Sequence, residues 1–243
     1  MPGARTLITG STSGIGHAIA MSLAPQRALL LHGRDPARTC ALAEACPRPG
    51  HHLEWVADLR DLGGVKDGLS ALLWGGERVS CLVHCAGMVQ VGAVREARPA
   101  MVREQFRVNV LSAVAMLQAI LQGPDPQSLE SVVLVSSAAS RRGEPGAALY
   151  SATKGALDGL VAALAVQLAP QVRVNGVLPG IVPTPMSKTT LEGPDFLSKA
   201  ASKYPLGIGR VEDVVAAVRF LVSQEARWIT GMLMSVDGGR TVV

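Results

Sequence analysis

Short apolar runs alternate with helix-length segments along the whole chain. Runs bounded by turn residues and rich in Val, Leu and Ile are typical of strands. Seven of them predict strands: Arg5–Thr9, Ala28–His32, His52–Ala57, Val79–His84, Ser131–Ser136, Val172–Leu178 and Met232–Val236. Strands that alternate with helices are joined by right-handed crossovers, so they lie parallel in one sheet. The pattern predicts an α/β fold, a doubly wound parallel sheet of about seven strands with helices on both faces.

The length of the chain favours one domain over two small ones. A chain of 243 residues can bury most of its apolar surface in a single core, and we expect one domain spanning residues 1–243. The long irregular stretch runs from Pro179 to Tyr204 and contains three prolines. Because long loops in compact domains are often lids, we expect a substrate lid at about residues 181–206.

Composition narrows the class of protein. Hydrophobic residues make up 48% and aromatic residues 3%, which suits an aliphatic interior between two helical layers. The net charge is +4, but the longest basic run is Arg141-Arg142, so no nucleic-acid stripe is visible. No apolar run approaches the roughly 20 residues that span a bilayer, and no hydrophobic leader opens the chain. We therefore expect a cytoplasmic protein, without nucleic-acid or membrane partners.

The cysteines also favour a cytoplasmic protein. The four cysteines, Cys40, Cys46, Cys81 and Cys85, lack C-x-x-C spacing and nearby histidines. We interpret them as reduced thiols and expect no metal site.

A glycine-rich loop follows the first predicted strand and precedes an Ala-rich helix. Glycines let the backbone approach a pyrophosphate, and a helix N-terminus offers unpaired N–H groups and a positive dipole end. The alternative is a tight strand-to-helix turn that merely requires glycine. The loop residues expected to bind a dinucleotide are Gly10, Ser11, Thr12, Ser13, Gly14, Ile15 and Gly16.

The end of the second strand should contact the adenosine ribose. Asp35 precedes Pro36 and is better placed as a helix N-cap, which leaves Arg34 for the ribose. A guanidinium accommodates a 2′-phosphate bidentately, so we predict that NADP(H) is preferred and that NAD(H) is possible. Asp58, after the third strand, could accept a hydrogen bond from the adenine amino group. The alternative is that Asp58 caps the helix after Leu59.

Tyr150 and Lys154 stand four residues apart, on one face of a predicted helix. A cation beside a phenol lowers a pKa that is about 10 in model peptides, so Tyr150 could exchange protons near neutral pH. Ser137 is an upstream hydroxyl candidate, although Ser136 and Ser140 compete with it. The alternative for Tyr150 and Lys154 is an unremarkable surface pair on an Ala-rich helix.

The ordered set of motifs resembles the short-chain dehydrogenase/reductase family, in the single-domain branch that includes 3-oxoacyl carrier-protein reductases. The likeness covers nearly the whole chain and implies a Rossmann-type fold. Its motifs are Thr9-Gly10 to Gly16, Asp58, His84-Cys85-Ala86-Gly87, Asn109, Ser137, Tyr150 with Lys154, Asn175 to Gly180, Thr184, Gly209-Arg210, Thr230-Gly231 and Asp237-Gly238-Gly239. The chain departs from the family at His84-Cys85, where the branch usually has Asn-Asn, and we expect little consequence.

The resemblance implies roles for the catalytic residues. Tyr150 would donate a proton to the alkoxide, Ser137 would hydrogen-bond the carbonyl oxygen, and Lys154 would lower the tyrosine pKa and hold the nicotinamide ribose. The family spacing to the tyrosine selects Ser137. Asn109, within a helix expected from Pro99 to Leu121, would position a water near Lys154; an ordinary polar helix residue is the alternative.

The resemblance also implies the cofactor contacts. Thr184 would hold the nicotinamide carboxamide, with capping of a local turn as its alternative. The further residues expected to line the cofactor are Leu59, Cys85, Ala86, Gly87, Pro179, Gly180 and Val182.

The implied reaction is reduction of a carbonyl, in a 3-oxoacyl thioester or a small ketone, to a secondary alcohol. Residues 108–140 contain no Lys or Arg, which disfavours an acidic carrier there. Arg141 and Arg142 could engage a carboxylate, phosphate or thioester carrier, or form a solvated pair. The alternatives are an alcohol dehydrogenase working oxidatively and a non-catalytic nucleotide-binding regulator. The family suggests a homotetramer or dimer.

Overall fold

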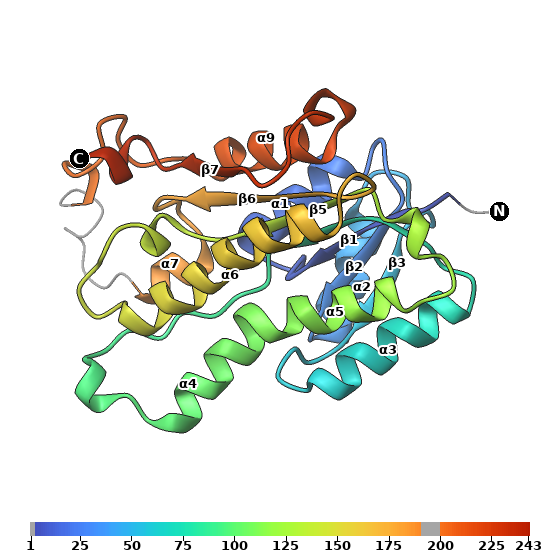
Figure 1. Ribbon diagram of the computed structural model, residues 1–243, viewed down its shortest axis with the longest axis horizontal. Coiled ribbons are helices and arrows are strands. Elements are labelled where there is room, and N and C mark those ends of the chain that lie inside the picture. Colours follow the sequence, from blue (N-terminus) through green and yellow to red (C-terminus); the bar gives the residue numbers. More distant parts are fainter. Residues whose placement is uncertain (1–2, 191–199) are drawn as a thin grey trace.

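The computed structural model describes residues 3–190 and 200–243, in which seven parallel strands form one sheet (Figure 1). The order is β3-β2-β1-β4-β5-β6-β7. The strands are β1 (Arg5–Thr9), β2 (Leu29–Gly33), β3 (Leu53–Val56), β4 (Val79–His84), β5 (Ser131–Val135), β6 (Arg173–Pro179) and β7 (Leu233–Val236). Every strand end lies within one residue of its predicted position, and the predicted doubly wound α/β class is confirmed.

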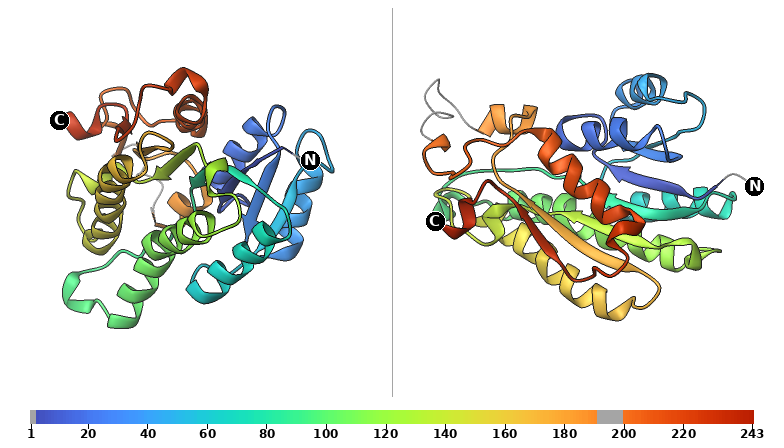
Figure 2. Two further views of the ribbon diagram at one scale, coloured as in Figure 1. Left: turned by 45° about the vertical axis from the view of Figure 1, so that its right-hand side comes forward. Right: turned by 90° about the horizontal axis from the view of Figure 1, so that it is seen from above.

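Helices cover both faces of the sheet (Figure 2). One face holds α1 (Gly14–Leu23), α2 (Pro36–Ala45) and α9 (Val211–Val222). The other face holds α3 (Leu62–Trp74), α4 (Pro99–Phe106), α5 (Ser112–Leu121) and α6 (Ala148–Gln167). Two aliphatic cores result, and each buried Leu, Ile or Val side chain stabilises the fold by about 1.5–3 kcal/mol. Short helical turns are α7 (Pro185–Thr190), η1 (Val94–Glu96), η3 (Pro126–Ser128), η4 (Ala138–Ser140), η5 (Gln224–Ala226) and η6 (Arg240–Val242).

The helix expected from Pro99 to Leu121 is interrupted at its middle. Residues Arg107–Leu111 form a π-helical turn, η2, between α4 and α5. Such turns insert one extra residue and often occur at functional sites. Asn109 lies inside this turn and is fully buried.

The expected lid is only partly within the described residues. Its first part contains α7, and residues 191–199 lie outside the described ranges. Beyond them, the Tyr204 hydroxyl accepts a hydrogen bond from the Ile181 amide at 3.1 Å. The two described ends of the segment therefore meet beside the carboxyl end of β6.

Helix α6 corrects the expectation that no segment is long and apolar enough to span a bilayer. It has 20 residues and a mean hydropathy of 1.2. Its buried residues include Leu157, Val161 and Ala165, which belong to the core beneath the sheet. Packing on the sheet explains the apolar residues on this buried face of the helix.

The order of strands reverses between β1 and β4, and this defines where a ligand fits. Thr9 at the end of β1 is in register with His84 at the end of β4. In doubly wound sheets, ligands bind in the crevice outside the carboxyl ends of strands at this switch point. The glycine loop after β1 and the segment after β4 both open there.

Candidate active site

The glycine loop fits a pyrophosphate. Gly10 has a φ of +64°, and a Cβ there would lie 2.9 Å from the Ala86 Cα. A Cβ on Gly16 would lie 2.4 Å from the Gly10 oxygen, so both positions require glycine. Within the described residues, the N-cap Ser13 makes no side-chain capping bond to α1. The first N–H groups of α1 therefore remain available to an anion.

Not every loop residue presents its side chain to that crevice. Ser11 is buried, and its hydroxyl donates to the His32 carbonyl at 3.0 Å, so only its backbone can take part. The Thr12 carbonyl accepts from the guanidinium of Arg38 at 2.9 Å. Arg38 therefore lies beside the phosphate loop, a position the sequence analysis missed. Its place in the first turn of α2, near Arg34, could have indicated this position.

A buried histidine, His32, supports this loop. The Gly10 amide donates to His32 Nδ1 at 3.3 Å, so Nε2 carries the proton and donates to the Ala57 carbonyl at 3.1 Å. Burial lowers the pKa of His32 to about 4. His32 is thus a neutral spacer between the phosphate loop and β3.

At the adenosine end, the predicted cap on α2 is confirmed. Asp35 accepts from the Arg38 amide at 3.1 Å, which leaves Arg34 exposed with its charge unused by the cap. The capping alternative for Asp58 is wrong, because Asp61 caps α3 by accepting from the Gly64 amide at 3.1 Å.

The Asp58 carboxylate is instead paired with Arg60. The Arg60 amide donates to it at 2.9 Å and the Nη2 group at 2.6 Å. This hydrogen bonding lowers the pKa of Asp58, and the nearby charge of Arg34 adds to the effect. Leu59 between them is buried. Asp58 and Arg34 therefore lie close together at the ends of β3 and β2.

His84 links the cofactor crevice to the π-helical turn. Thr9 Oγ1 accepts from the amides of Cys85 and Ala86 at 3.1 and 3.0 Å, so its own proton goes to His84 Nδ1 at 3.0 Å. Nε2 then carries the imidazole proton and donates to the Asn109 carbonyl at 3.3 Å.

Burial holds His84 neutral by lowering its pKa to about 3. His84, which stands where the family usually has Asn, therefore connects β1 to the π-helical turn. The sequence alone predicted little consequence of this departure. The connection could not be seen without the register of β1 against β4.

The Asn109 side chain is fully occupied. Its Oδ1 accepts from the Met88 amide at 2.7 Å, and its Nδ2 donates to the Met88 carbonyl at 2.9 Å and to Thr153 Oγ1 at 3.0 Å. A Cβ on Gly87 would lie 3.5 Å from both Asn109 Oδ1 and Lys154 Nζ. Asn109 thus joins the segment after β4 to α6, and its backbone carbonyl already accepts from His84.

Ser137, Tyr150 and Lys154 come together at the start of α6. Ser137 lies close enough to the Tyr150 phenol to lower its pKa, while Lys154 Nζ lies 5.7 Å from the centre of the tyrosine ring. The competing hydroxyls point elsewhere, since Ser136 donates to the Lys154 carbonyl at 3.1 Å and Ser140 to Asp158 at 2.6 Å. The structure therefore favours Ser137.

Burial dominates the electrostatics of this group. It raises the pKa of Tyr150 to about 12, against the opposing effect of Ser137. It lowers the pKa of Lys154 to about 8. The expected lowering of the tyrosine pKa by Lys154 is absent in this arrangement, because the ammonium donates to the Val135 carbonyl at 2.8 Å. Tyr150 is consequently a protonated phenol at neutral pH, able to act as an acid.

The loop after β6 faces the phosphate loop. A Cβ on Gly14 would lie 3.4 Å from the Thr184 side chain, and Val182 is buried. A Cβ on Gly180, next to Pro179, would lie 2.8 Å from the Tyr204 ring. Thr184 Oγ1 accepts from the Ser187 amide at 3.2 Å. Thr184 therefore caps its own turn, as the alternative predicted, and also lies beside the phosphate loop.

The four cysteines are free thiols. Burial raises the pKa of Cys85 to about 12, so it stays a thiol beside Lys154. Over residues 3–190 and 200–243, no group of three His, Cys, Asp or Glu side chains is arranged to hold a metal ion.

Comparison with known proteins agrees with this geometry. The family model described as enoyl-(acyl carrier protein) reductase matches residues 10–241. The chain belongs to the short-chain dehydrogenase/reductase family. It is 32% identical to the L-xylulose reductase of Bos taurus, over 98% of this chain and 97% of that protein. It is 30% identical to the 3-oxoacyl-(acyl-carrier-protein) reductase of Thermotoga maritima, over 97% of each.

A solved structure shares both fold and length. The gluconate 5-dehydrogenase of Burkholderia cenocepacia, in complex with NADP and tartrate, superposes with a TM-score of 0.92 at 26% identity, covering 100% of this chain and 97% of that chain. The protein is therefore an oxidoreductase that uses a nicotinamide cofactor.

Proposed function

We propose that the protein is an NADP(H)-dependent reductase that converts the carbonyl of a small ketone or 3-oxoacyl thioester to a secondary alcohol. The observation that carries the proposal is the grouping of Ser137, Tyr150 and Lys154, with Lys154 Nζ 5.7 Å from the centre of the tyrosine ring. These groups stand at the carboxyl end of the sheet, as does the glycine loop.

The nicotinamide cofactor, when bound, supplies the hydride. The residues of this chain supply the proton and the charge stabilisation. Tyr150 donates its phenolic proton to the alkoxide oxygen, and Ser137 hydrogen-bonds that oxygen as negative charge develops. Lys154, whose ammonium donates one hydrogen bond to the Val135 carbonyl, holds the nicotinamide ribose with its remaining N–H donors. Asn109 and His84 fix the segment that carries Cys85, Ala86 and Gly87 against the cofactor.

The preference for NADP(H) rests on the cations at the adenosine end. Arg34 is exposed at the end of β2, and Arg38 lies on the first turn of α2 against the Thr12 carbonyl. The Asp58 carboxylate, which would repel a 2′-phosphate, is neutralised by Arg60. A relative solved with NADP supports the same preference. Leu59, Val182, Pro179, Gly180 and Thr184 complete the proposed lining of the cofactor.

The alternative direction of the reaction is oxidation of a secondary alcohol. Relatives named dehydrogenases favour this direction, for which Tyr150 must act as a base. The raised pKa of Tyr150 favours the acid role and hence reduction. Relatives named L-xylulose reductase and gluconate dehydrogenase support small polar substrates.

The proposal is tested by following NADPH oxidation with a panel of ketones, and with acetoacetyl thioesters of coenzyme A and of carrier protein. We expect turnover of ketones. Turnover of the thioesters alone would move the substrate class to acyl chains, and no turnover of either class would overturn the proposal.

We also propose a cytoplasmic homotetramer or dimer, with α4, α6 and β7 at the interfaces. Exposed apolar side chains, such as Val166 at 82% exposure on α6, support an interface there. Size-exclusion chromatography with light scattering tests this, and the mass of a single 25.3 kDa chain would contradict it.

A further inference from the structure

A cavity of about 540 Å³ opens between the segment that follows Ser137 and the C-terminal end of the chain. Arg142 and Glu144 line one side, Lys203 another, and Arg240 on η6 a third. The segment 142–145 lies between the catalytic candidates Ser137 and Tyr150 in the chain. The cavity is thus lined by the segment that joins Ser137 to Tyr150, without including either residue.

The walls of this cavity are fixed by buried contacts. Arg240 is buried and pairs with Glu144 at 2.6 Å. Its guanidinium lies 5.8 Å from the centre of the Tyr204 ring. Tyr204 in turn accepts the Ile181 amide and packs on Gly180, in the loop after β6. The cavity is therefore built onto both segments that flank the proposed cofactor and carbonyl sites.

The side chains that line the cavity carry more positive than negative charge, and the terminal residue Val243 also stands on its wall. Glu144 neutralises Arg240, but Arg142 and Lys203 have no ion-pair partner within residues 3–190 and 200–243. Arg142 makes one long hydrogen bond, to the Arg240 carbonyl at 3.4 Å, and Lys203 is exposed. Two cations from separate segments, facing one cavity, form a complementary site for a small oxyanion.

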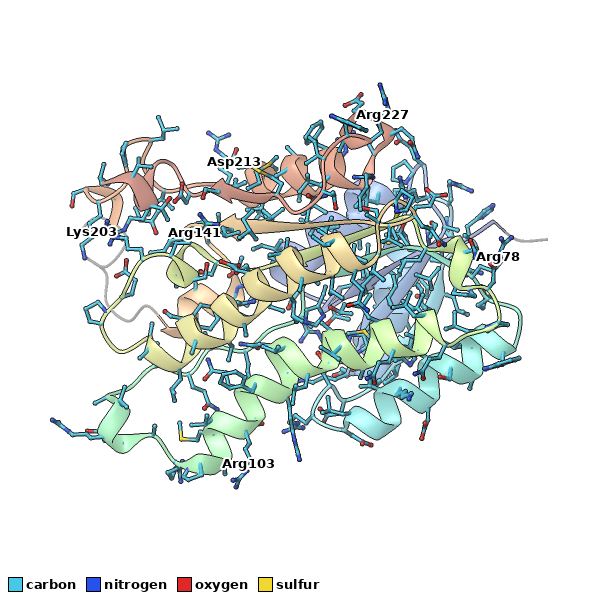
Figure 3. The ribbon with its side chains drawn as sticks, in the orientation of Figure 1. Arg78, Arg103, Arg141, Lys203, Asp213 and Arg227 are labelled. Atoms are coloured by element: carbon cyan, nitrogen blue, oxygen red, sulfur yellow. The ribbon has the colours of Figure 1, made fainter. Side chains whose placement is uncertain are left out.

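The neighbouring Arg141 makes a useful contrast. It is half-exposed, its Nε lies 4.0 Å from Asp158, and it does not line the cavity. Arg141 and Lys203 both stand near the end of the molecule where the strands terminate (Figure 3). Of the two adjacent arginines that the sequence singled out, only Arg142 faces the cavity.

We propose that this cavity binds a carboxylate or phosphate group on the carbonyl substrate, held between Arg142 and Lys203. The inference rests on the proposed reductase function and narrows its substrates to anionic carbonyl compounds. Arg240 is a positioning residue in this site, since it joins the segment after Ser137 to Tyr204.

The kinetic test uses matched pairs of ketones with NADPH. Levulinate is compared with 2-pentanone for a carboxylate, and dihydroxyacetone phosphate with dihydroxyacetone for a phosphate. The readout is the ratio of kcat/KM for the anionic member over the neutral one. We expect Arg142→Gln and Lys203→Gln each to lower this ratio by about tenfold, the effect of losing one charged hydrogen bond. Arg141→Gln, the matched control, should leave the ratio within about twofold.

A binding measurement separates this inference from the reductase proposal. Succinate and inorganic phosphate are titrated calorimetrically into the full chain saturated with NADP⁺. We expect wild type and Arg141→Gln to bind one of the two anions and the Arg142→Gln/Lys203→Gln double variant to lose that binding.

If anions bind in this way but no ketone is reduced, the site stands and the reductase proposal fails. If ketones are reduced with the same anion preference in the double variant, or the wild type binds neither anion, the site is refuted and the reductase proposal stands. NADPH binding by each variant, followed by fluorescence, shows whether it has folded.

Discussion

The two ends of the cofactor crevice are built on opposite principles. At the reacting end, polar groups are buried and fixed to one another: Thr9 to His84, His84 to Asn109, and Asn109 to Thr153. At the adenosine end, the charged groups Arg34, Arg38 and Asp58 are exposed to solvent. Under the proposed function, burial would set the chemistry at the first end, whereas surface charge would set cofactor recognition at the second.

The difference follows from what each end must do. Proton transfer depends on the pKa values of the groups involved, and desolvation shifts the pKa of Tyr150 up and that of Lys154 down. Recognition of a phosphate requires cations that stay charged, which solvent exposure guarantees. Mutations at the two ends should therefore affect different kinetic parameters.

The largest effect is expected for Tyr150→Phe, which removes the proposed proton donor but keeps the ring. We expect kcat to fall by about 10³-fold or more, while the dissociation constant of NADPH changes little. Steady-state kinetics and fluorescence titration of NADPH measure the two quantities. Turnover close to that of wild type would remove Tyr150 from the mechanism.

His84→Leu should be next in size. It leaves the Thr9 hydroxyl and the Asn109 carbonyl without their buried partner, at a cost of about 1–3 kcal/mol in the free energy of unfolding. We expect kcat to fall about tenfold, because the π-helical turn is no longer tied to β4. His32→Leu is the matched control: it removes a buried histidine under the phosphate loop, so it should raise KM for NADPH instead. Equal effects of both variants on kcat would contradict the difference between the reacting end and the adenosine end of the crevice.

Arg34→Ala should change specificity rather than rate. We expect the preference for NADPH over NADH, measured as the ratio of kcat/KM values, to fall about tenfold as one phosphate contact is lost. Arg103→Ala, at an exposed site on α4, should leave the ratio unchanged. Equal use of both cofactors by the wild type would contradict the assignment of Arg34.

Much of this architecture is predictable from local pattern. The seven strands follow from apolar runs, and the Asp35 cap follows from Pro36 at the next position. Family spacing selects Ser137 over Ser136 and Ser140, and the hydrogen bonds that occupy Ser136 and Ser140 elsewhere agree with it.

The remaining features depend on contacts between distant segments. Asp58 is not a helix cap because Arg60 claims its carboxylate and Asp61 serves α3 instead. The π-helical turn at Asn109 accompanies bonds to Met88 and Thr153, 21 and 44 residues away. The role of His84 depends on pairing across β1 and β4. None of these contacts can be predicted from the spacing of apolar and polar residues along the chain.

The pH dependence of reduction tests the buried end most directly. With the pKa of Lys154 lowered to about 8, its ammonium is present below that pH and lost above it. We predict that kcat/KM for the ketone, at saturating NADPH, is constant up to about pH 8 and then falls by up to tenfold per pH unit. With the pKa of Tyr150 raised to about 12, no second fall should occur near pH 10, where an ordinary tyrosine titrates. A profile that stays flat through pH 10, or rises as the phenol would ionise, would contradict the assignment of Tyr150 as a buried acid beside a charged Lys154.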